Sequence, residues 1–233
     1  MSKAEEIKRD LWNLADPERA ALCQRYFKTK KGEYGEGDQF IGVDVPGVRK
    51  VAKRYKDVSL GDVQTCVRSK IHEERLCALI ILADKYVRAE EKGQETIYNF
   101  YLKNLKYVNN WDLVDQSASR IAGRYLLDRP KDILYQLVKS KNIWKRRVAI
   151  ISTLNFVVNG KYADTLKISE LLLKDTHDLI HKAVGWMLRE IGKRDLKTEE
   201  GFLKKYYKIM PRTMLRYAIE KFPEERRCEL LRK

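Results

Sequence analysis

The sequence predicts an all-α protein built as an α-solenoid, in which helical pairs stack one after another. Apolar residues recur with the 3.6-residue period of amphipathic helices, and the period-2 alternation of strands is almost absent. Gly (12) and Pro (5) are sparse for a chain of 233 residues. The helical pattern also recurs at intervals of about 35 residues, which is typical of stacked helical repeats.

The individual helices follow from the same period. Residues 72–88 place Leu76, Leu79 and Ile80 on one face, which predicts an amphipathic helix. Similar patterns predict long helices over 110–127, 142–158, 176–192 and 211–222, and shorter ones over 46–55, 95–105, 130–138, 164–173 and 199–209. N-terminal helices are expected within residues 1–56, interrupted by a glycine-rich loop over 30–46. We expect a single repeat domain over residues 1–233, with the repeats running through 57–233.

A common register supports the repeat. The helices align with Ala78, Val114, Ala149, Ala183 and Ala218 in phase, at steps of 36, 35, 34 and 35 residues. In a solenoid of this kind, one helix of each pair lines a concave groove. The alternative is an irregular helical bundle in which similar spacings arise by chance.

Composition bounds the function. Lys and Arg number 48 against 33 Asp and Glu, a net charge of +15, which favours a partner rich in phosphates. An apolar fraction of 44% is too high for a disordered basic tail. The sequence has neither an apolar run long enough to span a membrane nor a signal-peptide h-region, so we expect a cytoplasmic protein without a membrane partner. The four cysteines form no CxxC pair and are expected to be buried free thiols.

Metal, cofactor and nucleophile motifs are weak. His177 and His181 have the i, i+4 spacing of a two-ligand clamp, but zinc needs three or four ligands and the chain holds 3 histidines. The loop over 30–46 matches no nucleotide-binding pattern, so no metal and no cofactor are expected. The helix that follows this loop carries Arg49 and Lys50 and could hold backbone phosphates at its N-terminus.

Trp111 and Trp186 are expected to lie outside the core. Trp111 and Asp115 share a helix face at i, i+4, whereas Leu113 and Val114, with Ala118, point to the core. A carboxylate beside an indole is unusual on a surface meant for phosphates.

In the repeat register, Trp186 and Arg147 fall on groove-lining helices, whereas Trp12 and Trp144 are expected in the core. Taken singly, each of these residues is explained better by ordinary packing or solvation than by a site. Their coincidence on successive repeats is what favours a site.

Several segments resemble the AlkD-type DNA alkylation-repair glycosylases. They are 109–115 (NNWDLVD), 142–147 (NIWKRR) and 182–190 (KAVGWMLRE), preceded by 25–28 (RYFK), 40–43 (FIGV) and 46–49 (PGVR). The resemblance spans most of the chain in the same order. It implies a right-handed α-solenoid of HEAT-like helical repeats with a concave DNA-binding groove. Members of that family excise bases made cationic by alkylation.

Carried over position by position, the resemblance implies roles for individual residues. Asp115 would be the catalytic carboxylate, and Trp111 and Trp186 would pack against the lesion-bearing nucleotide. Arg147 would contact the DNA backbone near the lesion, and Tyr26 would lie close to the same site. Together with Arg49, Lys50 and Arg189, they make up the set expected to contact DNA. The chain departs from the family pattern where aromatic residues are replaced by residues 178–180 (DLI), and where a lysine is replaced around Asn155.

The resemblance therefore implies a monofunctional alkylpurine DNA glycosylase. It would hydrolyse the N-glycosidic bond of N3- or N7-alkylated purines in duplex DNA, act as a monomer and use no small-molecule cofactor. A fixed carboxylate suits this reaction because the transition state resembles an oxocarbenium ion. The alternatives are a non-catalytic repeat protein that binds damaged or branched DNA, and a helical scaffold for an acidic protein.

Overall fold

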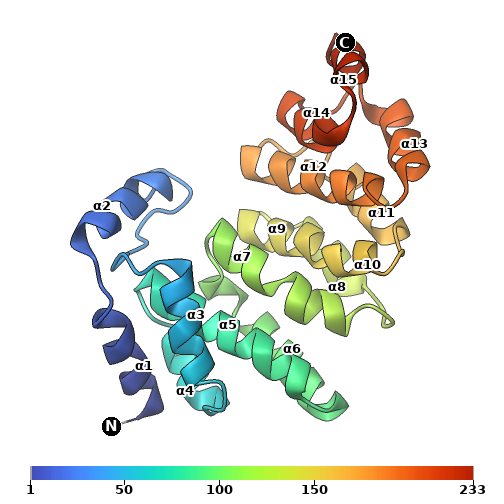
Figure 1. The fold of residues 1–233 in the computed structure, drawn as a ribbon. Coiled ribbons are helices and arrows are strands. Elements are labelled where there is room, and N and C mark those ends of the chain that lie inside the picture. The colour runs from blue at the N-terminus through green and yellow to red at the C-terminus, as the bar shows by residue number, and fades with distance from the viewer. Residues whose placement is uncertain (1, 233) are drawn as a thin grey trace. The chain divides into compact units, whose positions relative to one another are not determined.

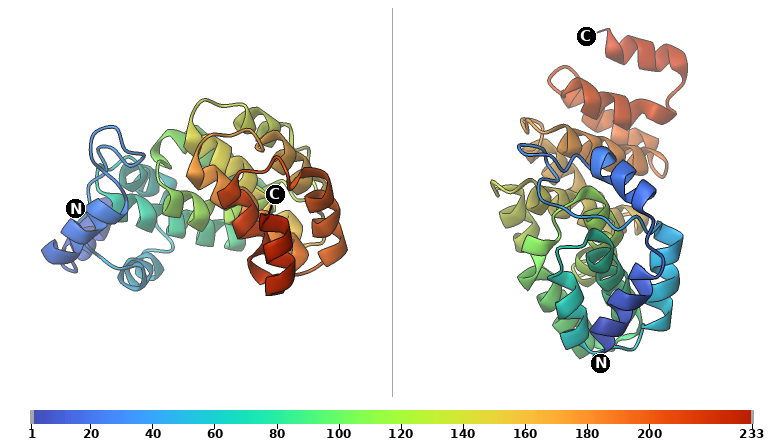
Figure 2. Two further views of the ribbon diagram at one scale, coloured as in Figure 1. Left: turned by 90° about the horizontal axis from the view of Figure 1, so that it is seen from above. Right: turned by 90° about the vertical axis from the view of Figure 1, so that its left-hand side faces the viewer.

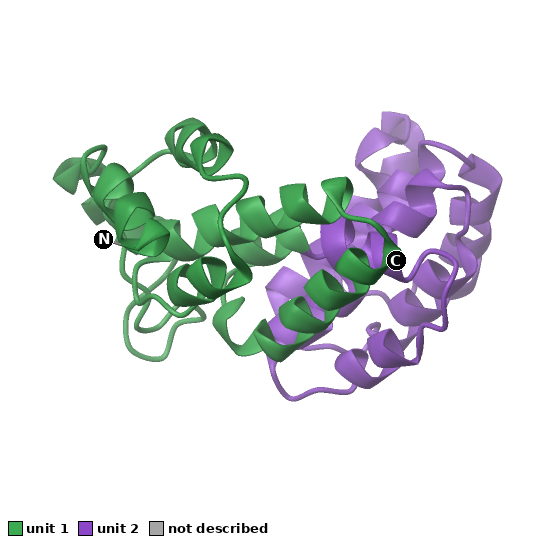
Figure 3. Cartoon of the chain, turned by 90° about the horizontal axis from the view of Figure 1, so that it is seen from below, with its two compact units in different colours: residues 1–117 green, residues 118–233 purple. Residues whose placement is uncertain are grey.

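The computed structural model describes residues 2–232, and within that range its regular elements are helices (Figure 1). One isolated β-bridge pairs Gln39 with Ile71. The predicted all-α class is confirmed, and the stacked helices are consistent with an α-solenoid. None of these helices combines the length and the apolar character needed to cross a bilayer. The chain divides into two compact units, residues 1–117 (unit 1) and 118–233 (unit 2), coloured separately in Figure 3.

Unit 1 is built around one long helix. Its elements are α1 (Lys3–Trp12), α2 (Pro17–Tyr26), α3 (Val45–Arg54), α4 (Leu60–Val67), α5 (His72–Arg88), α6 (Glu91–Lys103), the 3₁₀ helix η1 (Leu105–Tyr107) and α7 (Trp111–Ser117). Helix α5 packs against α1, α3, α4, α6 and α7. Most of its apolar side chains, including Leu79, Ile81 and Leu82, are buried and form the core of the unit, whereas Val87 in its last turn is exposed.

Helix α2 differs from the other helices of unit 1 because none of its residues is buried. Asp16 caps it by accepting hydrogen bonds from the Glu18 and Arg19 amides at 3.0 and 3.1 Å, and Pro17 occupies its first turn. Its inner side faces a cavity described below. The chain then runs through the glycine-rich loop, where Gly42 has φ +83° and an added Cβ would lie 2.1 Å from the Asp16 carbonyl oxygen.

Unit 2 is organised around α12. Its elements are the π-helix η2 (Ser119–Gly123), α8 (Asp132–Val138), α9 (Ile143–Ser152), α10 (Leu154–Val158), α11 (Ala163–Leu171), α12 (Asp178–Gly192), α13 (Leu196–Tyr206), α14 (Arg212–Ala218), the 3₁₀ helix η3 (Ile219–Lys221) and α15 (Glu224–Leu231). Helix α12 packs against α9, α11, α13 and α14. The succession α9, α12, α14 can be followed in Figure 1 and in the turned views of Figure 2.

A glycine permits the close approach of α12 and α14. A Cβ on Gly185 would lie 2.5 Å from both the Met214 carbonyl oxygen and the Tyr217 Cβ. Backbone cannot yield at that distance, so the glycine in the segment that resembles the repair family has a packing role. The neighbouring Trp186 remains half-buried.

The repeat register agrees with the burial pattern. Ala78, Val114, Ala149, Ala183 and Ala218 each have 0% exposure, and they lie on α5, α7, α9, α12 and α14. Five positions aligned by sequence alone are therefore all core positions.

Several details of the sequence prediction are wrong. Trp12 is 53% exposed and donates its indole N–H to Glu74, whereas Trp144 is buried as expected. The helix expected over 142–158 breaks at Thr153, whose hydroxyl donates to the Ile150 carbonyl at 2.7 Å and competes with the helix. Of the four cysteines expected to be buried, Cys228 is exposed and Cys23 is half-buried, whereas Cys66 and Cys77 are buried.

Candidate functional site

The first turn of α7 presents the two residues that the sequence singled out. The Asn110 carboxamide oxygen accepts a hydrogen bond from the Trp111 amide at 2.9 Å, where the helix begins. Leu113 and Val114 are completely buried, whereas Trp111 and Asp115 are partly exposed. The predicted division of this helix into a core face and a face carrying an indole and a carboxylate is confirmed.

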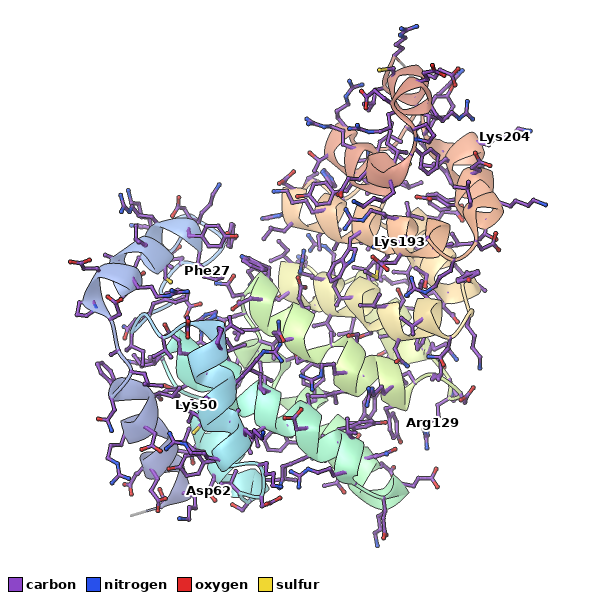
Figure 4. All side chains as sticks on the ribbon, in the orientation of Figure 1. Phe27, Lys50, Asp62, Arg129, Lys193 and Lys204 are labelled. Carbon is purple, nitrogen blue, oxygen red and sulfur yellow. The ribbon has the colours of Figure 1, made fainter. Side chains whose placement is uncertain are left out.

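Trp111 belongs to an aromatic cluster. Its ring stacks on Phe27 with centroids 5.2 Å apart and planes 13° apart, and Tyr26 meets it edge-on at 6.0 Å. Phe27 in turn stacks on Phe40 at 4.8 Å. Phe27 lies where α2 meets the glycine-rich loop, at the place labelled in Figure 4. The structure thus brings together Tyr26 and Trp111, two of the predicted site residues.

A cavity of ≈ 570 Å³ lies within unit 1 beside this cluster. Its wall is mostly apolar and is formed by Arg19, Leu22, Cys23, Tyr26, Phe27, Phe40, Val43, Asp44, Val45, His72, Glu73, Leu76, Trp111 and Asp112. The rim includes exposed apolar side chains, with Leu22 at 56% and Tyr26 at 68% exposure. Helix α2 therefore forms one wall of a hydrophobic cavity.

Buried hydrogen bonds fix the C-terminal end of α7, close to Asp115. Ser117 donates its hydroxyl to the Leu113 carbonyl at 2.6 Å, so it accepts the hydrogen bond from the Tyr101 hydroxyl at 3.0 Å. Burial raises the pKa of Tyr101, and the negative charge of Asp115 raises it further. The Tyr101 hydroxyl therefore stays protonated and acts as a donor.

Arg49 and Lys50 lie exposed on α3 (Lys50 is labelled in Figure 4). Arg49 donates to the Gln116 side chain at 2.7 Å, which places its guanidinium beside α7. The N-terminus of α3 is already capped, because the Asp44 carboxylate accepts the Gly47 amide at 2.7 Å. A phosphate at that helix end would meet this carboxylate, which disfavours the phosphate site expected at the helix N-terminus.

Sequence reasoning missed a buried polar network at the start of α5. His72 lies between the carboxylates of Asp38 and Asp112, and Arg75 and Asn110 also donate to Asp38. The signal was present in the sequence, since residues 72–75 (HEER) directly precede the apolar run 76–83 of the same helix. Four such residues at the head of a core helix are costly to bury unless they are paired.

The remaining predicted site residues belong to unit 2. Arg147 on α9 is 5% exposed and donates to the Leu179 carbonyl at 2.5 Å. Trp186 and Arg189 on α12 are half-buried, and Arg189 forms an ion pair with Glu220. Asn155, which stands where the resembled family has lysine, donates to the Gly123 carbonyl at 3.2 Å in the π-helix.

The two histidines considered as a metal clamp have structural hydrogen bonds instead. His177 caps α12 by accepting the Leu179 amide at its Nδ1 atom, 3.1 Å away. His181 bonds through its Nε2 atom to the Asp175 carbonyl at 2.5 Å. Across residues 2–232, no group of three or more His, Cys, Asp and Glu side chains could hold a metal ion.

Comparisons with known proteins agree with the fold. A family model described as DNA alkylation repair enzyme matches residues 7–222. A solved structure titled "Predicted DNA alkylation repair enzyme from Enterococcus faecalis" aligns over 90% of this chain and 97% of its own, with a TM-score of 0.70 and 17% sequence identity. At that identity the likeness concerns the fold. No curated protein matches the chain.

Proposed function

Since the chain belongs to the DNA alkylation repair enzyme family, we propose that it is a monofunctional DNA glycosylase for purines made cationic by alkylation at N3 or N7. It acts on duplex DNA, as a monomer and without a small-molecule cofactor. Asp115 is the catalytic carboxylate, and Trp111 and Trp186 pack against the damaged nucleotide. The observation that carries the proposal is the half-exposed pair of Trp111 and Asp115 on one face of α7.

The reaction is a hydrolysis at C1′ of the deoxyribose. The bond from C1′ to the purine nitrogen breaks, and its electron pair leaves with the base and neutralises the positive charge there. The sugar becomes oxocarbenium-like, and the oxygen of water bonds to C1′ while the water proton passes to Asp115 or to solvent. A carboxylate fixed near the sugar stabilises this charge and orients the water.

Aromatic side chains suit the cationic substrate. An indole face attracts a cation by about 0.5–2 kcal/mol, depending on how far both are desolvated. The stack of Phe27 behind Trp111 limits the orientations open to that indole. A damaged, charged nucleotide is thereby favoured over a neutral one.

The basic residues of unit 2 support binding to a polyanion. Between residues 118 and 150 the chain carries nine lysines and arginines against two aspartates. Arg147 lies in this segment, as do the exposed Lys139 and Lys141. Phosphate contacts of this kind release counterions and make affinity fall steeply with salt.

The test is mass-spectrometric detection of bases released from methylated duplex DNA. Wild-type protein should release N7-methylguanine or N3-methyladenine, and Asp115→Asn should lower the single-turnover rate by about 100- to 1000-fold, the usual cost of losing one electrostatic stabiliser. Duplex affinity should change little, since removing a carboxylate does not remove a phosphate contact.

Asp132→Asn serves as the matched control, because Asp132 is an exposed aspartate at the start of another helix, α8. It should leave the rate unchanged. Full activity of Asp115→Asn would show that the catalytic assignment is wrong. Salt-sensitive duplex binding with no base released by the wild type would favour the non-catalytic binder of damaged or branched DNA.

A further inference from the structure

The buried histidine at the start of α5 connects three separate segments of unit 1. His72 is 1% exposed, and its partners Asp38 and Asn110 are 4% and 0% exposed. Asp38 lies in the glycine-rich loop, and Asn110 and Asp112 flank Trp111 at the start of α7. The proposed reaction uses none of these polar groups directly.

Hydrogen-bond geometry fixes the protonation of this histidine. Its Nδ1 atom is 2.8 Å from Asp38 Oδ2, and its Nε2 atom is 2.7 Å from Asp112 Oδ2. An ionised carboxylate can only accept, so both ring nitrogens must donate and the ring must be an imidazolium. A neutral ring would point a lone pair at one of the two carboxylates.

The surrounding charges favour the same state. Burial lowers the pKa of His72, but the charge of Asp112 and the hydrogen bonds that the ring donates to both carboxylates raise it to about 9. Burial raises the pKa of Asp38, and the bonds and charges of His72 and Arg75 more than offset this, so its pKa lies below the usual value. Asp38, His72 and Arg75 are buried, and Asp112 is half-buried at the edge of this network.

Other charged groups nearby are accounted for. Glu73 on α5 accepts the backbone amides of Ile41 and Gly42, the latter at 2.8 Å. Arg19 and Cys23 of α2 line the same cavity as His72. Phe40 from the loop stacks on the imidazole with centroids 4.3 Å apart. The stacking of Phe40 therefore fixes the plane of the imidazole, in addition to the hydrogen bonds at its two nitrogens.

We infer that His72 is a positioning residue, an imidazolium clamp that fixes the first turn of α7 and thereby the orientation of Trp111 and Asp115. Asp112 directly follows Trp111 and is bound to one side of the clamp. The other side holds Asp38, and the His72 amide donates to the Gln39 carbonyl at 2.7 Å. The loop so fixed carries Phe40, which stacks on Phe27 beneath Trp111. The effect of His72 on base release rests on the proposed function, whereas its effect on the orientation of Trp111 does not.

The protonation state can be observed directly, because the chain holds 3 histidines. Proton–nitrogen correlation spectra should show one imidazole with both nitrogens protonated at about pH 7.5, where an unperturbed histidine is mostly neutral. Its signals should be absent in His72→Gln and present in His181→Gln. A neutral His72 at that pH would overturn the clamp.

The positioning role is tested with two variants. His72→Gln should shift the indole N–H signal of Trp111, assigned by its loss in Trp111→Phe, and should lower the single-turnover rate of base release by about tenfold or more. Duplex affinity should stay within about twofold. His181→Gln is the control and should change neither quantity, because His181 contacts only the Asp175 carbonyl among the bonds described above.

Asp112→Asn provides the second variant if His72→Gln fails to fold. It removes the charge that contributes most to raising the pKa of His72. The rate of the wild type should hold up to pH about 9, and in Asp112→Asn the fall should begin about one pH unit or more lower. An unchanged pH profile together with an unshifted Trp111 signal would refute the inference. If the wild type releases no base, the proposed function fails, and the Trp111 signal alone decides the clamp.

Discussion

The two units of the chain carry very different charge. Unit 1 has 21 lysines and arginines against 19 acidic residues, a net charge of +2, whereas unit 2 has 27 against 14, a net charge of +13. Unit 1 contains Asp115, the aromatic cluster and the apolar cavity. Nearly all of the excess charge that suggested a phosphate-rich partner therefore belongs to the unit that lacks the proposed catalytic carboxylate.

This difference suggests a division of labour. A strongly basic surface binds a polyanion through its positive potential. The same potential opposes the cationic character that the sugar acquires in the transition state. A nearly neutral unit can keep a carboxylate and aromatic faces available for a cationic sugar and base. We expect unit 2 to supply most of the affinity for DNA and unit 1 to supply the chemistry.

The largest expected effect in this comparison concerns affinity. Replacing Lys139, Lys141 and Lys145 by glutamine should weaken duplex binding at moderate salt by about tenfold or more, and should reduce the salt slope by up to about 0.9 per lysine. The single-turnover rate at saturating protein should change little. Fluorescence anisotropy over a series of salt concentrations measures both quantities.

The matched control removes the same charge from unit 1. Lys92, Lys103 and Lys106 are exposed, and their replacement by glutamine should leave affinity and salt slope nearly unchanged. Equal losses in the two triple variants would mean that net charge alone governs binding, and the division of labour would be wrong.

A smaller effect concerns the packing of unit 2. Gly185→Ala should lower the free energy of unfolding by about 1–3 kcal/mol, since the added methyl would meet the α14 backbone at 2.5 Å. Gly201→Ala should raise it by up to about 1 kcal/mol, because Gly201 is an exposed position inside α13 with open space around it. Denaturant unfolding compares the two variants, and the same sign for both would contradict this account of Gly185.

A further expected effect is a pH dependence in the stability of unit 2. Glu199 is 2% exposed and its Oε1 atom has no hydrogen-bond partner within the described residues, so burial, aided by Glu200, raises its pKa to about 8 from 4.5. Between those values the folded protein binds a proton that the unfolded chain lacks. The stability of unit 2 should therefore decrease as the pH rises from 4.5 to about 8.

Glu199→Gln should flatten this dependence, because the amide does not titrate. Hydrogen exchange of amides in α12 and α13, followed at several pH values, measures the effect. Unit 1 offers a contrast: the raised pKa of His72 gives stability that is complete below pH 6.5 and is lost as the pH rises to about 9. Identical pH profiles in the two units would show that neither buried group governs local stability.

Much of the fold could be predicted because helical periodicity is a local property. The expected range 72–88 coincides with α5 (His72–Arg88), and Leu113 and Val114 point to the core as expected. Trp12 shows where periodicity fails. It has helical spacing, but it is the last residue of its helix, and it is 53% exposed although its indole N–H donates to Glu74 of α5.

The sequence by itself determined the all-α class, the repeat register, the net charge and the shared helix face of Trp111 and Asp115. The net charge follows from composition, and the other three follow from the spacing of side chains along the chain. Tertiary structure alone decided what lies behind that pair. Asp38, His72 and Asp112 are separated by 34 and 40 positions in the chain. No local pattern records that they meet, since their pairing depends on how a loop and two helices pack. The state of the imidazole follows only from that three-dimensional arrangement, because a histidine's charge is set by the partners that packing places around it.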